Sequence, residues 1–255
     1  MISLKSPREI TLMREAGRIT ALVLQEIEQY IKPGISTADL DAIVEAIILK
    51  NGATPSFKGL YDFPNAACIS VNEELVHGIP SFKKILQEGD IISIDVGANF
   101  KGYHGDSAWT YPVGEISEGA ANLLAVTKQA LFEGLKEVKA GAHLSNVSHA
   151  IGEYAYSHGY TVPLDYTGHG IGSNIHEEPI IPNFGDPKRG PILKAGMTLA
   201  IEPMFHQGKP FTKVLNDDWT VVTKDGKLSA HFEHTVLVTD TGYEILTEVK
   251  EGSAT

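Results

Sequence analysis

The sequence has very little cysteine, with Cys68 as the single example among 255 residues. One cysteine cannot form a disulfide within the chain, and it cannot build the zinc sites that need several thiolates. The chain therefore fits a reducing compartment, and any metal that it binds must be held by other ligands.

Long apolar runs are also missing. No segment approaches the roughly 20 apolar residues that a transmembrane helix needs. The first ten residues, MISLKSPREI, do not show the basic-then-apolar layout of a secretory signal. We expect a cytoplasmic protein that does not contact membranes.

Positive charge is scarce relative to negative charge. The chain has 21 Lys and Arg against 32 Asp and Glu, which gives a net charge of -11. Such a field repels polynucleotides and anionic lipid surfaces, so no direct nucleic-acid binding is expected. The 42% hydrophobic content is ordinary for a globular protein, and we expect a single catalytic domain over residues 1–255.

Two helices are predicted in the first fifth of the chain. Ser6, Pro7 and Glu9 form a capping box with proline at the first helical position. Apolar or small residues then recur at helical spacing through Ile27. A second helix is expected to begin after Ser36 and to end at 51–52, where the sequence is Asn-Gly.

An internal similarity organises the chain. Residues 31–54 align without a gap on residues 138–161, and the same offset of 107 residues places Asp95 on Glu202. A longer offset of 127 residues places YHGDS on AHFEH, so that Asp106 matches Glu233 and His104 matches His231. We interpret this similarity as a duplication. The alternative is a chance similarity between two generic helix-then-strand units.

The duplication divides the domain into related α+β halves of about 1–115 and 116–255. Segments 90–97 and 228–240 are β-branched and partly alternating, which predicts strands. In the first of these, Asp95 projects from the face opposite Ile94 and Val96.

The four matched acids are Asp95, Asp106, Glu202 and Glu233. Any one of them taken alone is more often a solvated residue at a strand end, because burial of a charge is costly. If all four converge on one cavity, they cannot all stay ionised without compensation, and two divalent cations would provide it. Oxygen ligands with one imidazole suit manganese, cobalt, iron or zinc.

Histidines in the segment TGHGIGSNIHEEP, residues 167–179, are candidates for that imidazole. His169 lies among glycines that alternate strictly, which indicates close backbone approach and not a phosphate-binding GxGxxG loop. For His169, a tight turn with an exposed histidine remains an alternative. The zinc pattern HExxH fails at His176, and the glycines argue against placing both histidines on a helix, which leaves a loop or a strand. His77 is a third candidate, and Cys68 with His77 as its base is a nucleophilic alternative.

Several motifs together resemble one family. ACISVNEELVHGIP, SIDVGANFKGYHGDSAWT, GHGIGSNIHEEP, LAIEPM and HFEHT occur in the order found in type I methionine aminopeptidases. The resemblance runs over nearly the whole chain. It implies the duplicated pita-bread fold, an α+β structure with a curved, mostly antiparallel sheet covered by helices.

The resemblance also implies a site and a mechanism. Two divalent ions would be held by a set of five ligands, of which Asp106 and Glu233 bridge both ions: Asp95, Asp106, His169, Glu202 and Glu233. A water held between the ions would attack the scissile carbonyl. His77 and His176 would contact the substrate, with His176 stabilising the oxyanion, and Glu202 would pass a proton to the leaving amine.

By the same resemblance, a pocket for the methionine side chain is formed by Leu60, Phe63, Cys68, Ile175 and Trp219. The family often has tyrosines at the positions of Leu60 and Phe63, so this chain departs from the pattern there. These five residues could also be ordinary core.

The activity implied is removal of the N-terminal methionine from nascent chains when the second residue is small. We expect a monomer that associates transiently with ribosomes. Related pita-bread enzymes cleave X-Pro bonds or creatine, but they usually carry an additional N-terminal domain. A metal-free peptide-binding module is the alternative from a different class, although such modules typically lose metal ligands.

Overall fold

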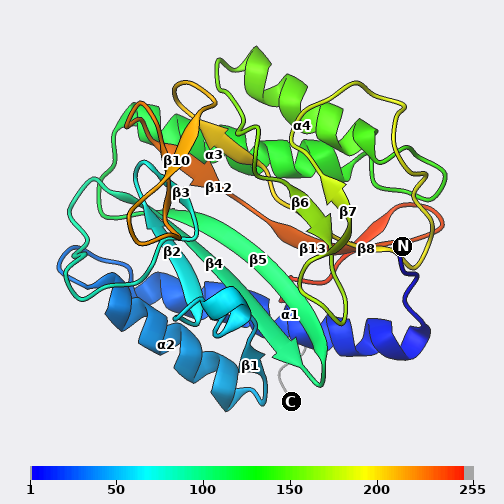
Figure 1. Ribbon diagram of the computed structural model, residues 1–255, viewed down its shortest axis with the longest axis horizontal. Helices are drawn as coiled ribbons and strands as arrows, with labels where there is room; N and C mark the ends of the chain where they lie inside the picture. The colour runs from blue at the N-terminus through cyan, green and yellow to red at the C-terminus, as the bar shows by residue number, and fades with distance from the viewer. Residues whose placement is uncertain (1, 250–255) are drawn as a thin grey trace.

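Helices flank a layer of antiparallel strands in the computed structural model, which describes residues 2–249 (Figure 1). On one side lie α1 (Pro7–Ile27) and α2 (Thr37–Lys50), and on the other lie α3 (Glu118–Leu135) and α4 (Ser145–Ser157). Short 3₁₀ helices span Glu28–Tyr30 and Leu60–Asp62. Within residues 2–249, no helix is long and apolar enough to cross a membrane.

The predicted helix ends are confirmed. Ser6 Oγ accepts a hydrogen bond from the Glu9 backbone N–H at 3.4 Å, and Glu9 Oε2 accepts one from the Ser6 N–H at 2.7 Å. Ser36 caps α2 in the same way, and α2 stops before Asn51. Satisfying the first free N–H groups fixes where each helix begins.

The strands form two larger sheets, and every pairing is antiparallel. The first sheet joins β1 (Thr54–Pro55), β2 (Ala67–Val71), β4 (Ile91–Phe100) and β5 (Tyr103–Pro112). The second has the order β14 (Tyr243–Ile245), β13 (His234–Val238), β8 (Thr198–Ile201), β6 (Gly168–Gly170), β7 (Glu177–Ile181). Smaller ladders join β10 (Thr212–Val214), β11 (Val221–Thr223) and β3 (Glu74–Val76), and β12 (Ser229–His231) with β9 (Met204–His206).

The segment 228–240 differs from the predicted continuous strand. It splits into β12 and β13, and Phe232 and Glu233 lie in the break. The Phe232 N–H donates to the carbonyl of Pro203, and the Glu233 N–H donates to the carbonyl of Ala108 in β5. These bonds satisfy the two amide groups outside a regular ladder, so the chain can change partner strands at the break.

The break brings the two sheets together along β5. Thr235 Oγ1 accepts a hydrogen bond from the Asp106 N–H at 3.0 Å and donates to the Asp106 carbonyl at 2.8 Å. Ser107 Oγ donates to the carbonyl of Glu233 at 2.5 Å. The backbones that carry Asp106 and Glu233 are therefore held side by side.

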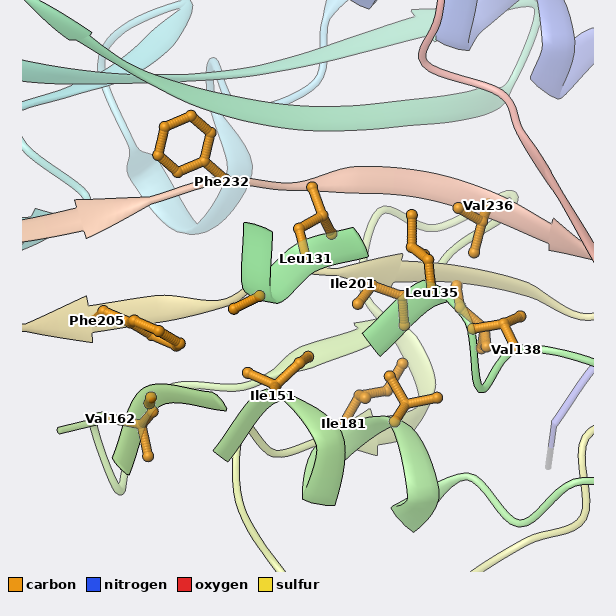
Figure 2. Packing of buried hydrophobic residues seen from close by; sticks show 14 of the residues in the cluster. Leu131, Leu135, Val138, Ile151, Val162, Ile181, Ile201, Phe205, Phe232 and Val236 are labelled. Atoms are coloured by element: carbon orange, nitrogen blue, oxygen red, sulfur yellow. The ribbon is translucent and has the colours of Figure 1, made fainter. Parts of the chain in front are cut away.

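Two hydrophobic clusters support the two sheets. One packs α1 and α2 against β2 and β4 and draws its buried residues from 19–113. The other packs α3 and α4 against the second sheet and draws its buried residues from 91–238; Figure 2 shows side chains such as Leu131, Ile151, Ile201 and Phe205 meeting there. The division into halves at residue 115 stays a prediction, and the separate cores are consistent with it.

The N-terminal segment is tied to the start of β7. Lys5 Nζ lies 2.8 Å from Glu177 Oε2, and the two side chains are only 4% and 15% exposed. Ser3 Oγ also donates to Glu177 at 3.1 Å, and the Lys5 N–H donates to the carbonyl of Gly196 at 2.7 Å. This buried ion pair fixes the backbone directly after His176.

We expect Lys5→Met to lower the free energy of unfolding by about 3–5 kcal/mol, because it leaves the carboxylate of Glu177 buried without its cation. Denaturant unfolding measures the loss. The exposed Lys83→Met is the control, with a change within about 0.5 kcal/mol. A Lys5→Met protein as stable as this control would show that the pair does not stabilise the fold.

Candidate metal centre

A cavity of about 640 Å³ collects residues from both sheets. All five predicted metal ligands line it: Asp95, Asp106, His169, Glu202 and Glu233. His77 and His176 line the same cavity. The structure therefore brings together side chains that are more than 150 residues apart in the sequence.

The strands explain how the carboxylates reach this cavity. In β4, Ile94 and Val96 are fully buried in the core beneath α1 and α2, so Asp95 points to the opposite face, as predicted. Glu202 directly follows β8, whose last residue, Ile201, is also fully buried. Alternation along each strand thus separates the acid from its apolar neighbours.

His169 is held as a neutral imidazole with one nitrogen free. Its Nδ1 lies 2.9 Å from the carbonyl of Gly170 and donates to it. Nε2 then carries the lone pair, and it lies 3.5 Å from Glu202 Oε1 and 3.7 Å from Asp106 Oδ2. Burial lowers the pKa of His169 to about 4, which keeps the ring neutral and able to bind a cation.

The surroundings of the four carboxyl groups disfavour their ionised form. Burial raises the pKa of Asp95 to about 7. Burial and then the neighbouring carboxylates raise the pKa of Asp106 and of Glu233 well above their ordinary values, and burial does the same for the pKa of Glu202. A cation placed among these groups would reverse the balance, because it favours the ionised carboxylates.

Unpaired oxygen atoms point to the same conclusion. Within residues 2–249, Asp95 Oδ1, Asp106 Oδ1 and Glu233 Oε1 are buried and have no hydrogen-bond partner. Asp106, His169 and Glu233 can each offer one ligand atom, and these atoms lie within 4.8 Å of one another. Buried polar atoms are normally paired, so this donor set fits a divalent cation held by carboxylate oxygens and an imidazole nitrogen.

The two remaining predicted histidines lie beside this cluster. His176 is exposed in the cavity, and its ring stands perpendicular to the His169 ring at 4.6 Å between centroids. His77 lies edge-on to Tyr166 at 6.0 Å and to Trp219 at 6.3 Å, and burial lowers the pKa of His77 to about 4. A molecule in the cavity can reach both rings.

One wall of the cavity is apolar. Leu60, Phe63, Cys68 and Trp219 line it, and the rings of Phe63 and Trp219 meet edge to face at 5.0 Å. Ile175 belongs to the same buried cluster but does not line the cavity. Further lining residues were not predicted from the sequence. Phe57 and Tyr166 lie outside the quoted motifs, and Val76 and Met204 lie inside them without a polar group that would single them out.

Cys68 is poorly suited to act as a nucleophile. It is 5% exposed, and burial, followed by the nearby carboxylates of Asp95 and Asp106, raises the pKa of its thiol well above the ordinary value. Nucleophilic cysteines react as thiolates. The geometry therefore favours an apolar lining role for Cys68 over the nucleophilic alternative.

The alternating glycines allow close contact between backbones. A Cβ atom at Gly168 would lie 2.5 Å from the carbonyl oxygen of Ala200, and one at Gly170 would overlap the carbonyl of Glu178. The glycines thus let β6 pack between β7 and β8, which places His169 in a strand, as the exclusion of a helix predicted.

His231 lies beside Glu202 and Glu233 and has no assigned role in the sequence-based prediction. It is 1% exposed, and its Nε2 lies 3.5 Å from Glu202 Oε2 and 3.9 Å from Glu233 Oε2. The signals in the sequence were its position two residues before Glu233 and its match with His104 in the repeat. Its repeat partner, His104, instead places Nδ1 2.8 Å from Ser56 Oγ.

Comparisons with known proteins agree with this site. Residues 11–240 match the model of metallopeptidase family M24. The chain is 57% identical over 249 residues to methionine aminopeptidase 1 of Bacillus subtilis, covering 98% of this chain and 100% of that protein. It is 42% identical over 251 residues to methionine aminopeptidase of Escherichia coli, covering 98% and 95%.

Solved structures share the architecture. Methionine aminopeptidase of Thermotoga maritima superposes with a TM-score of 0.97 at 47% identity, covering 98% of this chain and all of that one. Prolidase of Pyrococcus furiosus superposes with a TM-score of 0.80 at 25% identity, covering 97% of this chain and 66% of that one. The α+β fold is the pita-bread fold, and the chain belongs to metallopeptidase family M24, hydrolases that use divalent metal ions.

Proposed function

We propose that this protein is a dinuclear-metal exopeptidase that removes the N-terminal methionine from nascent chains when the second residue is small. The observation that carries the proposal is one cavity in which five carboxylate and imidazole ligands lie beside an apolar wall. The names of the relatives, methionine aminopeptidases at up to 57% identity over the full length, support the same reaction.

We assign the metal ligands to Asp95, Asp106, His169, Glu202 and Glu233. Asp106 and Glu233 would bridge two ions, since hydrogen bonds between β5 and residues 233–235 hold their backbones side by side. The ions, which could be cobalt, manganese, iron or zinc, would supply Lewis acidity and a water of lowered pKa.

The protein side chains would position the substrate and move protons. His176 is exposed in the cavity and would donate a hydrogen bond to the oxyanion that develops on the scissile carbonyl. His77 would bind the scissile amide region. Glu202 would carry a proton to the leaving amine.

The apolar wall would bind the methionine side chain. The wall presents uncharged aliphatic, sulfur and aromatic surface from Leu60, Phe63, Cys68 and Trp219. Ile175 would support the wall by packing behind it. An apolar pocket separates side chains that differ by one methylene by only about 1–3 kcal/mol. Limited cleavage after other unbranched apolar residues is therefore part of the proposal.

The proposed cellular setting follows from the substrate. A protein acting on nascent chains would be cytoplasmic and would associate transiently with ribosomes. We propose that it acts as a monomer and contacts peptide and not nucleic acid, in keeping with its net charge of -11.

The substrate proposal is tested with two peptides. Metal-loaded protein is expected to release methionine from Met-Ala-Ser and to leave Ala-Pro intact, as measured by chromatography, and a chelator should abolish the reaction. Cleavage of Ala-Pro alone would instead indicate an X-Pro peptidase like the prolidase that shares this fold. Cleavage of neither peptide would favour a binding module.

The bridging role of Asp106 is tested with Asp106→Asn, which removes one negative charge from the centre. We expect fewer than two ions per protein by elemental analysis. Mutation of a residue that merely orients a metal ligand typically weakens metal binding about 10- to 100-fold. Because Asp106 is itself a proposed ligand, we expect the metal affinity of Asp106→Asn to fall by at least this factor. Asp186→Asn, at an exposed position, is the control. Two bound ions with full activity in Asp106→Asn would disprove the assignment.

The role of His176 is tested with His176→Gln. We expect kcat for Met-Ala-Ser to fall about 100- to 1,000-fold with little change in KM, because oxyanion stabilisation acts in the transition state. The exposed His158→Gln should retain wild-type kinetics. A rise in KM at unchanged kcat would assign His176 to ground-state binding instead.

A further inference from the structure

His231 is a buried polar side chain whose ring nitrogen has no partner. Its Nε2 is shielded from solvent and makes no hydrogen bond within residues 2–249. Leaving a buried polar group unsatisfied costs about 1–3 kcal/mol. A compensating interaction is available from the carboxylates of Glu202 and Glu233, which lie 3.5 Å and 3.9 Å from Nε2.

The backbone of His231 is firmly placed. Thr110 Oγ1 accepts a hydrogen bond from the His231 N–H at 2.9 Å and donates to the His231 carbonyl at 2.8 Å. Ser93 Oγ lies 2.8 Å from the same Thr110 hydroxyl. His231 also pairs with Met204 at the end of β12. The backbone that carries the ring is thus held in place by its hydrogen bonds to β5.

Two imidazoles flank the carboxylate of Glu202. His169 Nε2 lies 3.5 Å from Oε1, and His231 Nε2 lies 3.5 Å from Oε2. His169 uses Nδ1–H on the carbonyl of Gly170, so its Nε2 has a lone pair for a cation. At 3.5 Å, the nitrogen of His231 is just beyond the usual 2.7–3.2 Å range of a hydrogen bond to Glu202.

We propose that His231 is a positioning residue for the metal centre. Its Nε2–H would donate to Glu202 Oε2 and hold that carboxylate in the orientation needed to bind a cation through Oε1. Direct ligation of the cation by His231 is the alternative, and the test below distinguishes it by the number of nitrogen ligands on the bound ion. The inference rests on the proposed metal-dependent function.

The test compares two substitutions in the otherwise intact protein. His231→Gln keeps an N–H donor, whereas His231→Leu fills similar space without one. Titration of metal-free protein with Mn²⁺, followed by calorimetry, should show a 10- to 100-fold weaker affinity for His231→Leu. His231→Gln should retain most of the wild-type affinity.

A matched control separates this effect from the loss of any buried histidine. Within residues 2–249, His206 is fully buried and its Nε2 also lacks a hydrogen-bond partner, but unlike His231 it forms no ion pair with Glu202 or Glu233. His206→Leu should therefore bind Mn²⁺ as tightly as the wild type. Thermal unfolding of each metal-free variant reports whether it is folded. If His231→Leu does not fold, His231→Phe, which keeps a planar ring without a donor, takes its place.

Three results would overturn the inference. Wild-type affinity in His231→Leu, or in His231→Phe where that variant is used, would mean that the ring has no role toward the cation. An equal loss in both His231→Gln and His231→Leu, with one fewer nitrogen ligand in the electron spin-echo spectrum of bound Mn²⁺, would make His231 a direct ligand. Equal loss in His206→Leu would make the effect nonspecific. In each case, cleavage of Met-Ala-Ser by the wild type would leave the proposed function standing.

Discussion

The burial of four carboxyl groups in one cavity is the constraint on which the rest of the structure depends. Asp95, Asp106, Glu202 and Glu233 are withheld from water, which raises the pKa of each group, and neighbouring carboxylates raise the pKa of Asp95, Asp106 and Glu233 further. Such an arrangement is tolerable only if the surrounding structure is rigid and a cation compensates the charge. The two sheets and their separate cores supply that rigidity.

Hydrogen bonds between β5 and residues 233–235 join the two sheets and bring the carboxylates together. Because the segment 228–240 breaks at Glu233, its backbone turns toward β5, where Thr235 and Ser107 make hydrogen bonds to the main chain. Glu233, in the break between β12 and β13, and Asp106, in β5, then line the same cavity. In a continuous strand, residue 233 would stay in a regular ladder, and the alternation of side chains along that strand would decide which face the Glu233 side chain points to.

Much of the fold was predictable because its signals are local. Ser6 and Ser36 begin the first two helices through hydrogen bonds within one turn, and alternation along β4 separates Asp95 from the core. That the five proposed ligands lie in one cavity was predictable from matched positions and from motifs that resemble a family. The residues of the apolar wall were less predictable, because Ile175 packs behind it, and Phe57 and Tyr166 line the cavity from segments outside the motifs.

By itself, the sequence determined the helix ends, the strand faces, the exclusion of disulfides and thiolate-rich metal sites, and the residue types available to hold a cation. Only the tertiary structure decided that Nδ1 of His169 is committed to Gly170, that Lys5 secures Glu177, and that His231 lies against Glu202. The physical reason is range. Caps and alternation act between neighbours in the chain, whereas the direction of a buried polar atom is set by whichever distant strand packs against it.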